Sequence, residues 1–204
     1  MSDSIIDNAV SLLRKTANRN TFIASSFFTA FICQPGGSSW HRIGQFFQHQ
    51  IAYNRGDGLY IIPSFYGGDN FGHYYVLLIH IENGEARGFS MDSLGTSYND
   101  KKSLIKHHIM VGFDIFSNRH WQDIPILLQT ELECGARCIW NMTLIVEAYK
   151  QHFPLHQIFE KIKTMGNISR AESAKIARED VFDIISTQSG STLFHKIFPP
   201  SPPE

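Results

Sequence analysis

The chain has 204 residues, of which 43% are hydrophobic and 18% charged, a composition that supports a globular core and excludes wholesale disorder. Its net charge of −1 argues against a protein whose main task is to hold a nucleic-acid backbone, and no apolar run is long enough to span a bilayer. Three cysteines do not make a disulfide framework, and the first residues lack the pattern of a secretory signal, so we expect an intracellular, reducing location.

The N-terminal segment predicts a helix. Its apolar residues from Ile5 to Leu13 recur at roughly helical spacing, and Asp3 or Ser4 can serve as the N-cap. The next segment, residues 22–32, is apolar and rich in β-branched and aromatic side chains. That pattern leaves two interpretations open, a strand and a buried helix.

Three consecutive strands are predicted in the middle of the chain, at residues 59–65, 73–82 and 85–93. The last two are separated by Asn83-Gly84, the strongest short-range signal for a tight β-hairpin. We therefore expect these two strands to pair in an antiparallel manner.

The C-terminal third changes to helical periodicity. We expect helices at about 134–151, 155–165 and 170–186, the last opened by a capping box formed by Ser169 and Glu172. The predicted fold class is therefore α+β, with a small, mostly antiparallel central sheet flanked by helices. One of these helices begins at a cysteine.

The domain organisation is expected to be simple. No repeat or interdomain linker divides the chain, so residues 1–197 should form a single domain whose C-terminal part, 155–190, is helical. Residues 198–204 contain four prolines in seven positions, which predicts an extended, mobile tail.

Three polar residues stand at the ends of predicted elements: His73 begins a strand, Asp92 ends its hairpin partner and Cys134 begins a helix. A helix N-terminus and a neighbouring histidine both favour a thiolate, and a carboxylate that accepts the Nδ1–H of the histidine would orient its ring. The hairpin would place His73 and Asp92 at the same end of paired strands. Taken singly, each residue has an ordinary structural interpretation: a satisfied histidine, a turn-forming aspartate and a small buried cysteine.

Three segments together resemble the adenain and SUMO-protease (Ulp-type) superfamily of cysteine endopeptidases. They are LYIIPSF…GHYYVLLIH, GFSMDSLG, and Gln129 followed by ECGARC, in the family's order of His, acid, Gln and Cys. The resemblance covers about residues 20–150 and is closest to viral maturation proteases of the adenovirus type.

The resemblance implies a role for each matching residue. Cys134 would be the nucleophile, His73 the general base and then acid, and Asp92 the residue that orients His73. Gln129 would stabilise the oxyanion together with the backbone N–H at Cys134. The spacing from Gln129 to Cys134 is short for the family, and Gln122 is the fallback.

Four residues near these positions are candidates for the substrate cleft: Tyr74, Trp121, Glu133 and Gly135. Tyr74 stands where the family commonly has Trp, and Glu133 stands where SUMO proteases commonly have Asp. Gly135 would let the chain turn closely into the helix, and Trp121 would wall the cleft.

Cys138 lies one helical turn after Cys134. Its ordinary interpretation is a core cysteine, and the alternative is a resolving thiol. A metal site with Cys134, Cys138 and His152 or His156 would lack the ligand spacing of structural zinc sites, so no metal is expected.

The predicted function is a cysteine endopeptidase that processes viral capsid or core precursors, which would place it in the host cytoplasm or the virion. The alternatives are a protease for ubiquitin-like modifiers, an effector-type acetyltransferase with the same triad order, and a non-enzymatic module with a remnant site. We expect protein substrates, no membrane partner, a monomer and no cofactor. A peptide or nucleic-acid activator, known in the adenovirus type, finds no support in the near-neutral charge.

Overall fold

The structure is a computed structural model and describes residues 3–26, 56–68, 71–95, 103, 105–107, 109, 121–126, 133–164, 170–187 and 194–198. Its elements are α1 (Asp3–Thr16), β1 (Thr21–Ile23), β2 (Gly58–Gly68), β3 (Phe71–Glu82), β4 (Glu85–Met91), β5 (Trp121–Asp123), α5 (Cys134–Lys150), α6 (Leu155–Thr164), α7 (Arg170–Thr187) and α8 (Phe194–Ile197). The five strands form one sheet in the order β1-β2-β3-β4-β5. The two edge strands pair in parallel and the inner pairs are antiparallel, which confirms the predicted α+β class.

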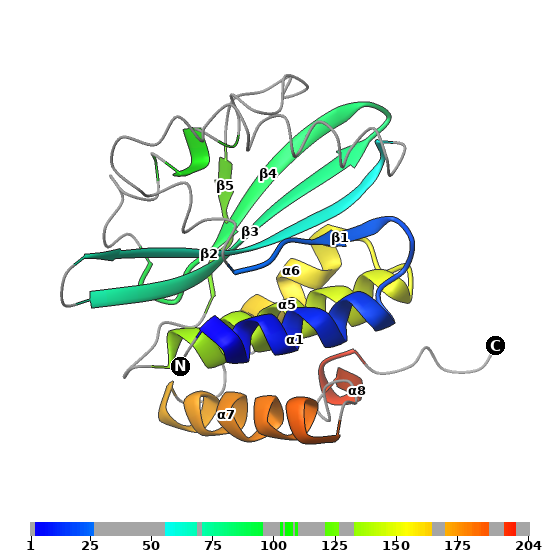
Figure 1. Cartoon of the computed structure of the whole chain (residues 1–204). Helices are drawn as coiled ribbons and strands as arrows, with labels where there is room; N and C mark the ends of the chain where they lie inside the picture. Colours follow the sequence, from blue (N-terminus) through cyan, green and yellow to red (C-terminus); the bar gives the residue numbers. More distant parts are fainter. Residues whose placement is uncertain are drawn as a thin grey trace.

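The molecule is layered, with α5 in the middle. Figure 1 shows α1, α5 and α6 against one face of the sheet and α7 on the far side of α1 and α5. Every residue of α5 from Gly135 to Val146 is buried. A helix that is enclosed on all sides needs apolar or paired side chains all around it, which explains why this segment is so hydrophobic. The first residue of α5, Cys134, is thus held on a rigid element.

The central hairpin forms as the sequence predicts. Asn83 and Gly84 have φ of 54° and 77°, as a type I′ turn requires, and Glu82 pairs with Glu85. The carboxylate of Asp57 accepts hydrogen bonds from the N–H groups of Asn83 and Gly84, at 2.9 and 3.2 Å. Turn and register together determine which residues meet at the opposite end of the hairpin.

Two short strands were not determined by the sequence pattern. β1 settles the start of the ambiguous segment as a strand, while residues 27–32 lie outside the described part of the chain. β5 was not predicted, because three residues are too few to show an alternating pattern. Trp121 of β5 lies over Gly88 of β4, where an added Cβ would come within 2.7 Å of the indole ring.

The predicted C-terminal helices are confirmed as α6 and α7, while Ser169 of the proposed capping box lies outside the described residues. Both helices contribute to the main core, for example through Ile158 and Val181. Phe198, expected in the mobile tail, is 1% exposed instead. Its ring packs against Phe153 and Phe194, so the folded body extends one residue further than predicted.

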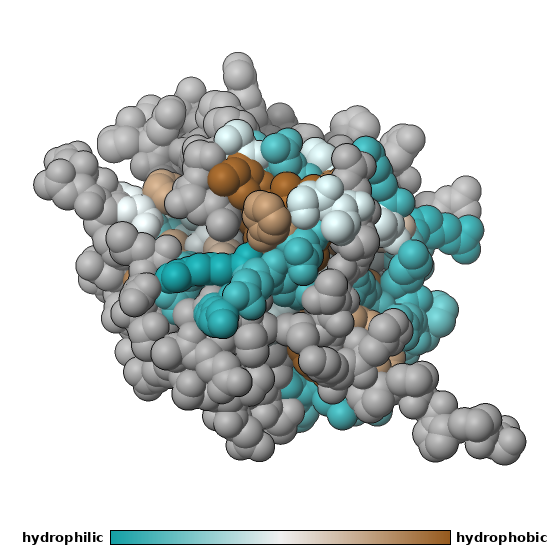
Figure 2. All heavy atoms as spheres, turned by 90° about the horizontal axis from the view of Figure 1, so that it is seen from below, coloured by the Kyte–Doolittle hydropathy of each residue, from teal (hydrophilic) through white to brown (hydrophobic). Residues whose placement is uncertain are grey.

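Figure 2 shows the molecule from below. Among the described side chains on this face, hydrophilic ones lie beside a smaller hydrophobic group. None of the helices within the described ranges is long and apolar enough to cross a membrane.

Candidate active site

The hairpin brings His73 and Asp92 together. His73 is the third residue of β3, and Asp92 follows β4 directly, so both lie at the end of the hairpin away from the turn. Nε2 of His73 lies 2.7 Å from Oδ1 of Asp92. The same carboxylate oxygen accepts the backbone N–H of Leu94 at 2.8 Å, which fixes the carboxylate in a local turn. The sequence expectation that the two residues meet is confirmed.

Cys134 completes the arrangement from the helical layer. It is the first residue of α5, which packs against β3, and its side chain is partly buried. Its thiol lies beside the imidazole of His73, close enough for each group to shift the pKa of the other. Sheet and helix therefore each supply one side of a Cys-His-Asp arrangement.

The electrostatics of this arrangement favour a thiolate beside an imidazolium. Burial raises the pKa of Cys134, but hydrogen bonds from His73 and from the backbone of Tyr74 and Gly135, with the charge of His73, outweigh burial and lower it. For His73, burial lowers the pKa, while the hydrogen bonds to Asp92 and Cys134 and their charges raise it above its ordinary value. The two shifts reinforce each other, because each group stabilises the charge of its partner.

The orientation of the imidazole differs from the sequence expectation. The Asp92 carboxylate contacts Nε2 of His73, whereas the sequence expectation was a contact with Nδ1. The ring is held by its surroundings, since His73 is 1% exposed. Tyr66 lies 5.1 Å away between ring centroids and Tyr75 is stacked at 6.5 Å. Sequence analysis missed both tyrosines, although the pairing of Tyr66 with His73 across β2 and β3 follows from the strand register.

The structure shows the surroundings of all four cleft candidates. The side chain of Tyr74 packs on Phe65 at 4.9 Å, and Tyr74 is 5% exposed, because it points to the face of the sheet covered by α5. Glu133 is 2% exposed and forms ion pairs, and Gly135 is buried within α5. These three side chains are thus buried or paired, and their place beside a substrate cleft stays a prediction. Trp121 remains half-buried on β5.

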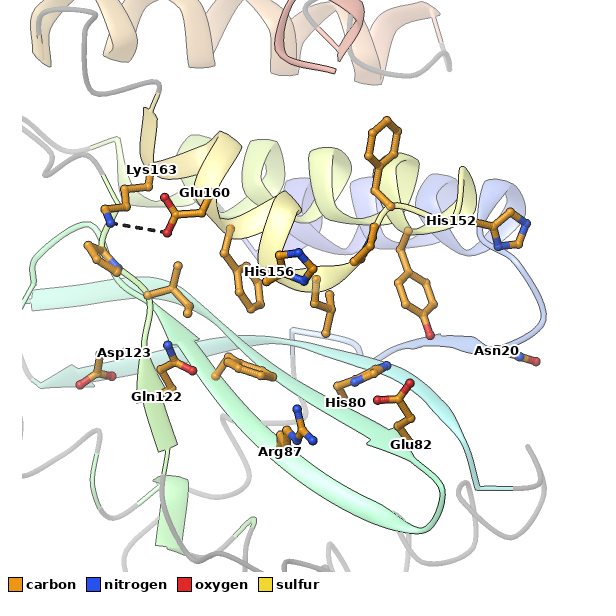
Figure 3. A pocket seen from close by; sticks show the side chains of 18 of the residues that line it. Asn20, His80, Glu82, Arg87, Gln122, Asp123, His152, His156, Glu160 and Lys163 are labelled. Atoms are coloured by element: carbon orange, nitrogen blue, oxygen red, sulfur yellow. Dashed lines mark ion pairs between the residues drawn. The ribbon is translucent and has the colours of Figure 1, made fainter. Parts of the chain in front are cut away.

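The structure describes one of the two glutamines considered as oxyanion donors. Gln129 lies outside the described residues, whereas Gln122 is exposed on β5. Gln122 lines a pocket of about 960 Å³ between the sheet and α6, which also includes His80, Phe89 and Phe159 (Figure 3). His73, Asp92 and Cys134 do not line this pocket, so it is separate from the Cys-His-Asp arrangement.

Cys138 belongs to the core. Its sulfur is buried and lies 3.8 Å from the carbonyl oxygen of Tyr75. Burial raises the pKa of Cys138 strongly, so this thiol stays protonated and does not suit the role of a resolving cysteine. His152 and His156 are exposed and line the pocket of Figure 3. Among the described residues, no three His, Cys, Asp or Glu side chains are grouped as a metal ion would require.

The fold is shared with solved structures. The SUMO protease Ulp1, with its catalytic cysteine oxidized to a sulfonic acid, aligns with a TM-score of 0.60 over 92% of this chain and 78% of its own, at 15% identity. The Xanthomonas campestris effector protein XopD bound to ubiquitin aligns with a TM-score of 0.57 over 74% of this chain and 76% of its own, at 13% identity. The Legionella pneumophila effector protein RavZ gives 0.52 over 93% and 75%, at 13% identity.

These similarities are structural. No protein-family model matches the sequence, and no curated protein matches it either. At 13 to 15% identity the alignments establish the fold, which is that of Ulp1-like proteases.

Proposed function

We propose that this protein is a cysteine endopeptidase in which Cys134 is the nucleophile, His73 the general base and acid, and Asp92 the residue that orients His73. One observation carries the proposal. A cysteine at a helix N-terminus lies beside a buried histidine, each group shifts the pKa of the other toward its charged form, and Nε2 of the histidine lies 2.7 Å from a carboxylate. This is the set of groups that generates and holds a reactive thiolate.

The proposed reaction has two stages. The Cys134 thiolate attacks the carbonyl carbon of the scissile bond, and the resulting tetrahedral intermediate collapses to a thioester as the amine leaves with a proton from His73. Neutral His73 then removes a proton from water, which hydrolyses the thioester and releases the carboxylate product and the thiolate.

The negative oxygen of the tetrahedral intermediate needs hydrogen-bond donors. The backbone N–H groups at the start of α5 lie beside Cys134 and suit this role. We propose Gln129 as the side-chain donor, on the strength of the motif resemblance.

For the substrate, we propose the C-terminal tail of a ubiquitin-like modifier. Ulp1 is a SUMO protease and XopD is seen bound to ubiquitin, so two structures with this fold act on or bind such modifiers. They favour the modifier class over the viral capsid class that the sequence resemblance suggested. The reduced cysteine that the reaction needs also fits the reducing location proposed from the sequence.

A fusion assay tests the proposal. Ubiquitin and SUMO, each followed by a reporter protein, are incubated with the wild type and with the Cys134→Ala variant, and the products are weighed by mass spectrometry. We expect cleavage after the terminal Gly-Gly by the wild type and none by Cys134→Ala, with nearly unchanged thermal stability because the side chain is only partly buried.

The assay also separates the alternative functions. A capsid-type enzyme would leave both fusions intact but cut internal sites in a peptide library. An acyltransferase would cleave neither and would form an acyl-enzyme thioester at Cys134 only when an acyl-coenzyme A is added as the acyl donor. Equal cleavage by the wild type and Cys134→Ala would contradict the proposed nucleophile.

A further inference from the structure

Glu133 lies immediately before Cys134, and its side chain is fully buried. Oε1 of its carboxylate accepts hydrogen bonds from Nε and Nη2 of Arg137, at 3.2 and 3.1 Å. Arg137 is 4% exposed, and its backbone N–H also donates to the Glu133 carbonyl oxygen at 3.0 Å. A buried carboxylate is costly unless it is paired, so Arg137 compensates the charge of Glu133.

A second arginine reaches the same carboxylate from another helix. Nη2 of Arg178, on α7, lies 3.6 Å from Oε2 of Glu133, and the Arg178 side chain is 51% exposed. Because α7 packs against α5, this ion pair joins the outer helix to the residue that precedes the nucleophile. We refer to Arg137, Glu133 and Arg178 as the arginine clamp.

The clamp accounts for a missing capping interaction at the start of α5. Glu133 occupies the N-cap position of α5, yet its side chain makes no capping hydrogen bond. An acidic side chain at this place can accept hydrogen bonds from the free N–H groups of the first turn. Here the carboxylate faces the two arginines instead, and the backbone N–H of Gly135 is left to lower the pKa of Cys134.

We propose that the arginine clamp holds the Glu133 carboxylate away from the first turn of α5 and so reserves the backbone N–H groups of that turn for the Cys134 thiolate. Arg178 is then a positioning residue, which acts through Glu133 and touches neither substrate nor reacting atoms. The inference rests on the proposed cysteine-protease function. Without Arg178 the carboxylate is less firmly held. It then competes for the same donors and brings negative charge toward the sulfur, and both effects disfavour the thiolate.

The pH dependence of Cys134 alkylation is affected by several neighbouring groups together. The charged and titratable groups near it on the described elements include His73, Asp92, Cys138, Glu133, Arg137 and Arg178, together with the buried Asp180 of α7 and the tyrosines Tyr66 and Tyr75 beside His73. Replacing Arg178 leaves the other side chains in place. A changed profile therefore reports on the clamp.

The test replaces Arg178 by methionine in the full chain. The rate at which iodoacetamide alkylates Cys134 is measured against pH, and kcat and KM are measured on the modifier fusion. For Arg178→Met we expect alkylation at pH 7 to slow by about threefold to tenfold and the profile to move to higher pH. We expect kcat to fall by a similar factor while KM stays the same, because the substrate does not contact Arg178.

Two further variants distinguish positioning from stability. Lys175→Met removes a cation from the same helix, but Lys175 is 73% exposed and pairs with Glu179 at 3.8 Å, so its profile should match the wild type. Arg178→Lys keeps the charge and should restore most of the alkylation rate. A wild-type alkylation profile in Arg178→Met, with or without a change in Tm, would overturn the inference and leave the proposed function standing. An unreactive Cys134 in the wild type at neutral pH would overturn both.

Discussion

The imidazole of His73 has two polar neighbours, Asp92 and Cys134. Asp92 lies 2.7 Å from Nε2, and both neighbours raise the pKa of the ring. Since His73 is almost completely buried, its charge depends on these two partners and not on solvent. The residue types and their order in the chain could be predicted from the sequence. The choice of nitrogen could not, because it depends on how Tyr66 and Tyr75 pack around the ring.

The pH dependence of activity should follow these shifts. The pKa of Cys134 is lowered, so activity rises with pH as the thiolate forms; the pKa of His73 is raised, so activity falls again only when the imidazolium loses its proton. Asp92→Asn removes the negative charge that raises the pKa of His73 and leaves at most a weaker, neutral hydrogen bond to the ring. We expect the alkaline limb of kcat/KM to move to lower pH and kcat/KM at neutral pH to fall by about 10²-fold. An alkaline limb that does not move would contradict the role of Asp92.

At the scale of elements, the β3–β4 hairpin places His73 and Asp92. Its turn was predictable because Asn-Gly favours positive φ at both positions, and the register then follows from the turn. The edge strand β5 was not predictable, since its place depends on the contact between Trp121 and Gly88 across the sheet. The ion pair between Glu133 and Arg178 was not predictable either, because the two residues lie on different helices and far apart in the sequence.

The turn can be tested separately from the chemistry. At Gly84, φ is 77° and an added Cβ would meet no atom within 4 Å, so Gly84→Ala introduces backbone strain and no clash. We expect the free energy of unfolding to fall by about 1 kcal/mol, measured by urea denaturation. Gly58→Ala is the matched comparison with a clash, since its Cβ would lie 2.2 Å from the carbonyl oxygen of Asn20, and it should be more destabilising. Full stability of Gly84→Ala would contradict the type I′ turn.

At the scale of the whole molecule, the candidate site exists only where two layers meet. The sheet supplies His73 and Asp92, and α5, enclosed between the sheet and the outer helices, supplies Cys134. The sequence predicted each layer from its own periodicity, but the contact between them depends on packing that no local pattern records. A lowered pKa of Cys134 is therefore a property of the folded chain.

The most direct measurement is the alkylation rate of Cys134 against pH in the native wild type, in native His73→Ala and in the denatured wild type, read by peptide mass spectrometry. We predict that native Cys134 reacts well below the pH at which an ordinary thiol ionises, about 8.5, and that both comparisons return it toward that value. Cys138 should stay unreactive in the native protein and react once the chain is unfolded, because burial protects it. A native Cys134 that titrates like the denatured one would contradict a thiolate–imidazolium pair, and with it the proposed nucleophile.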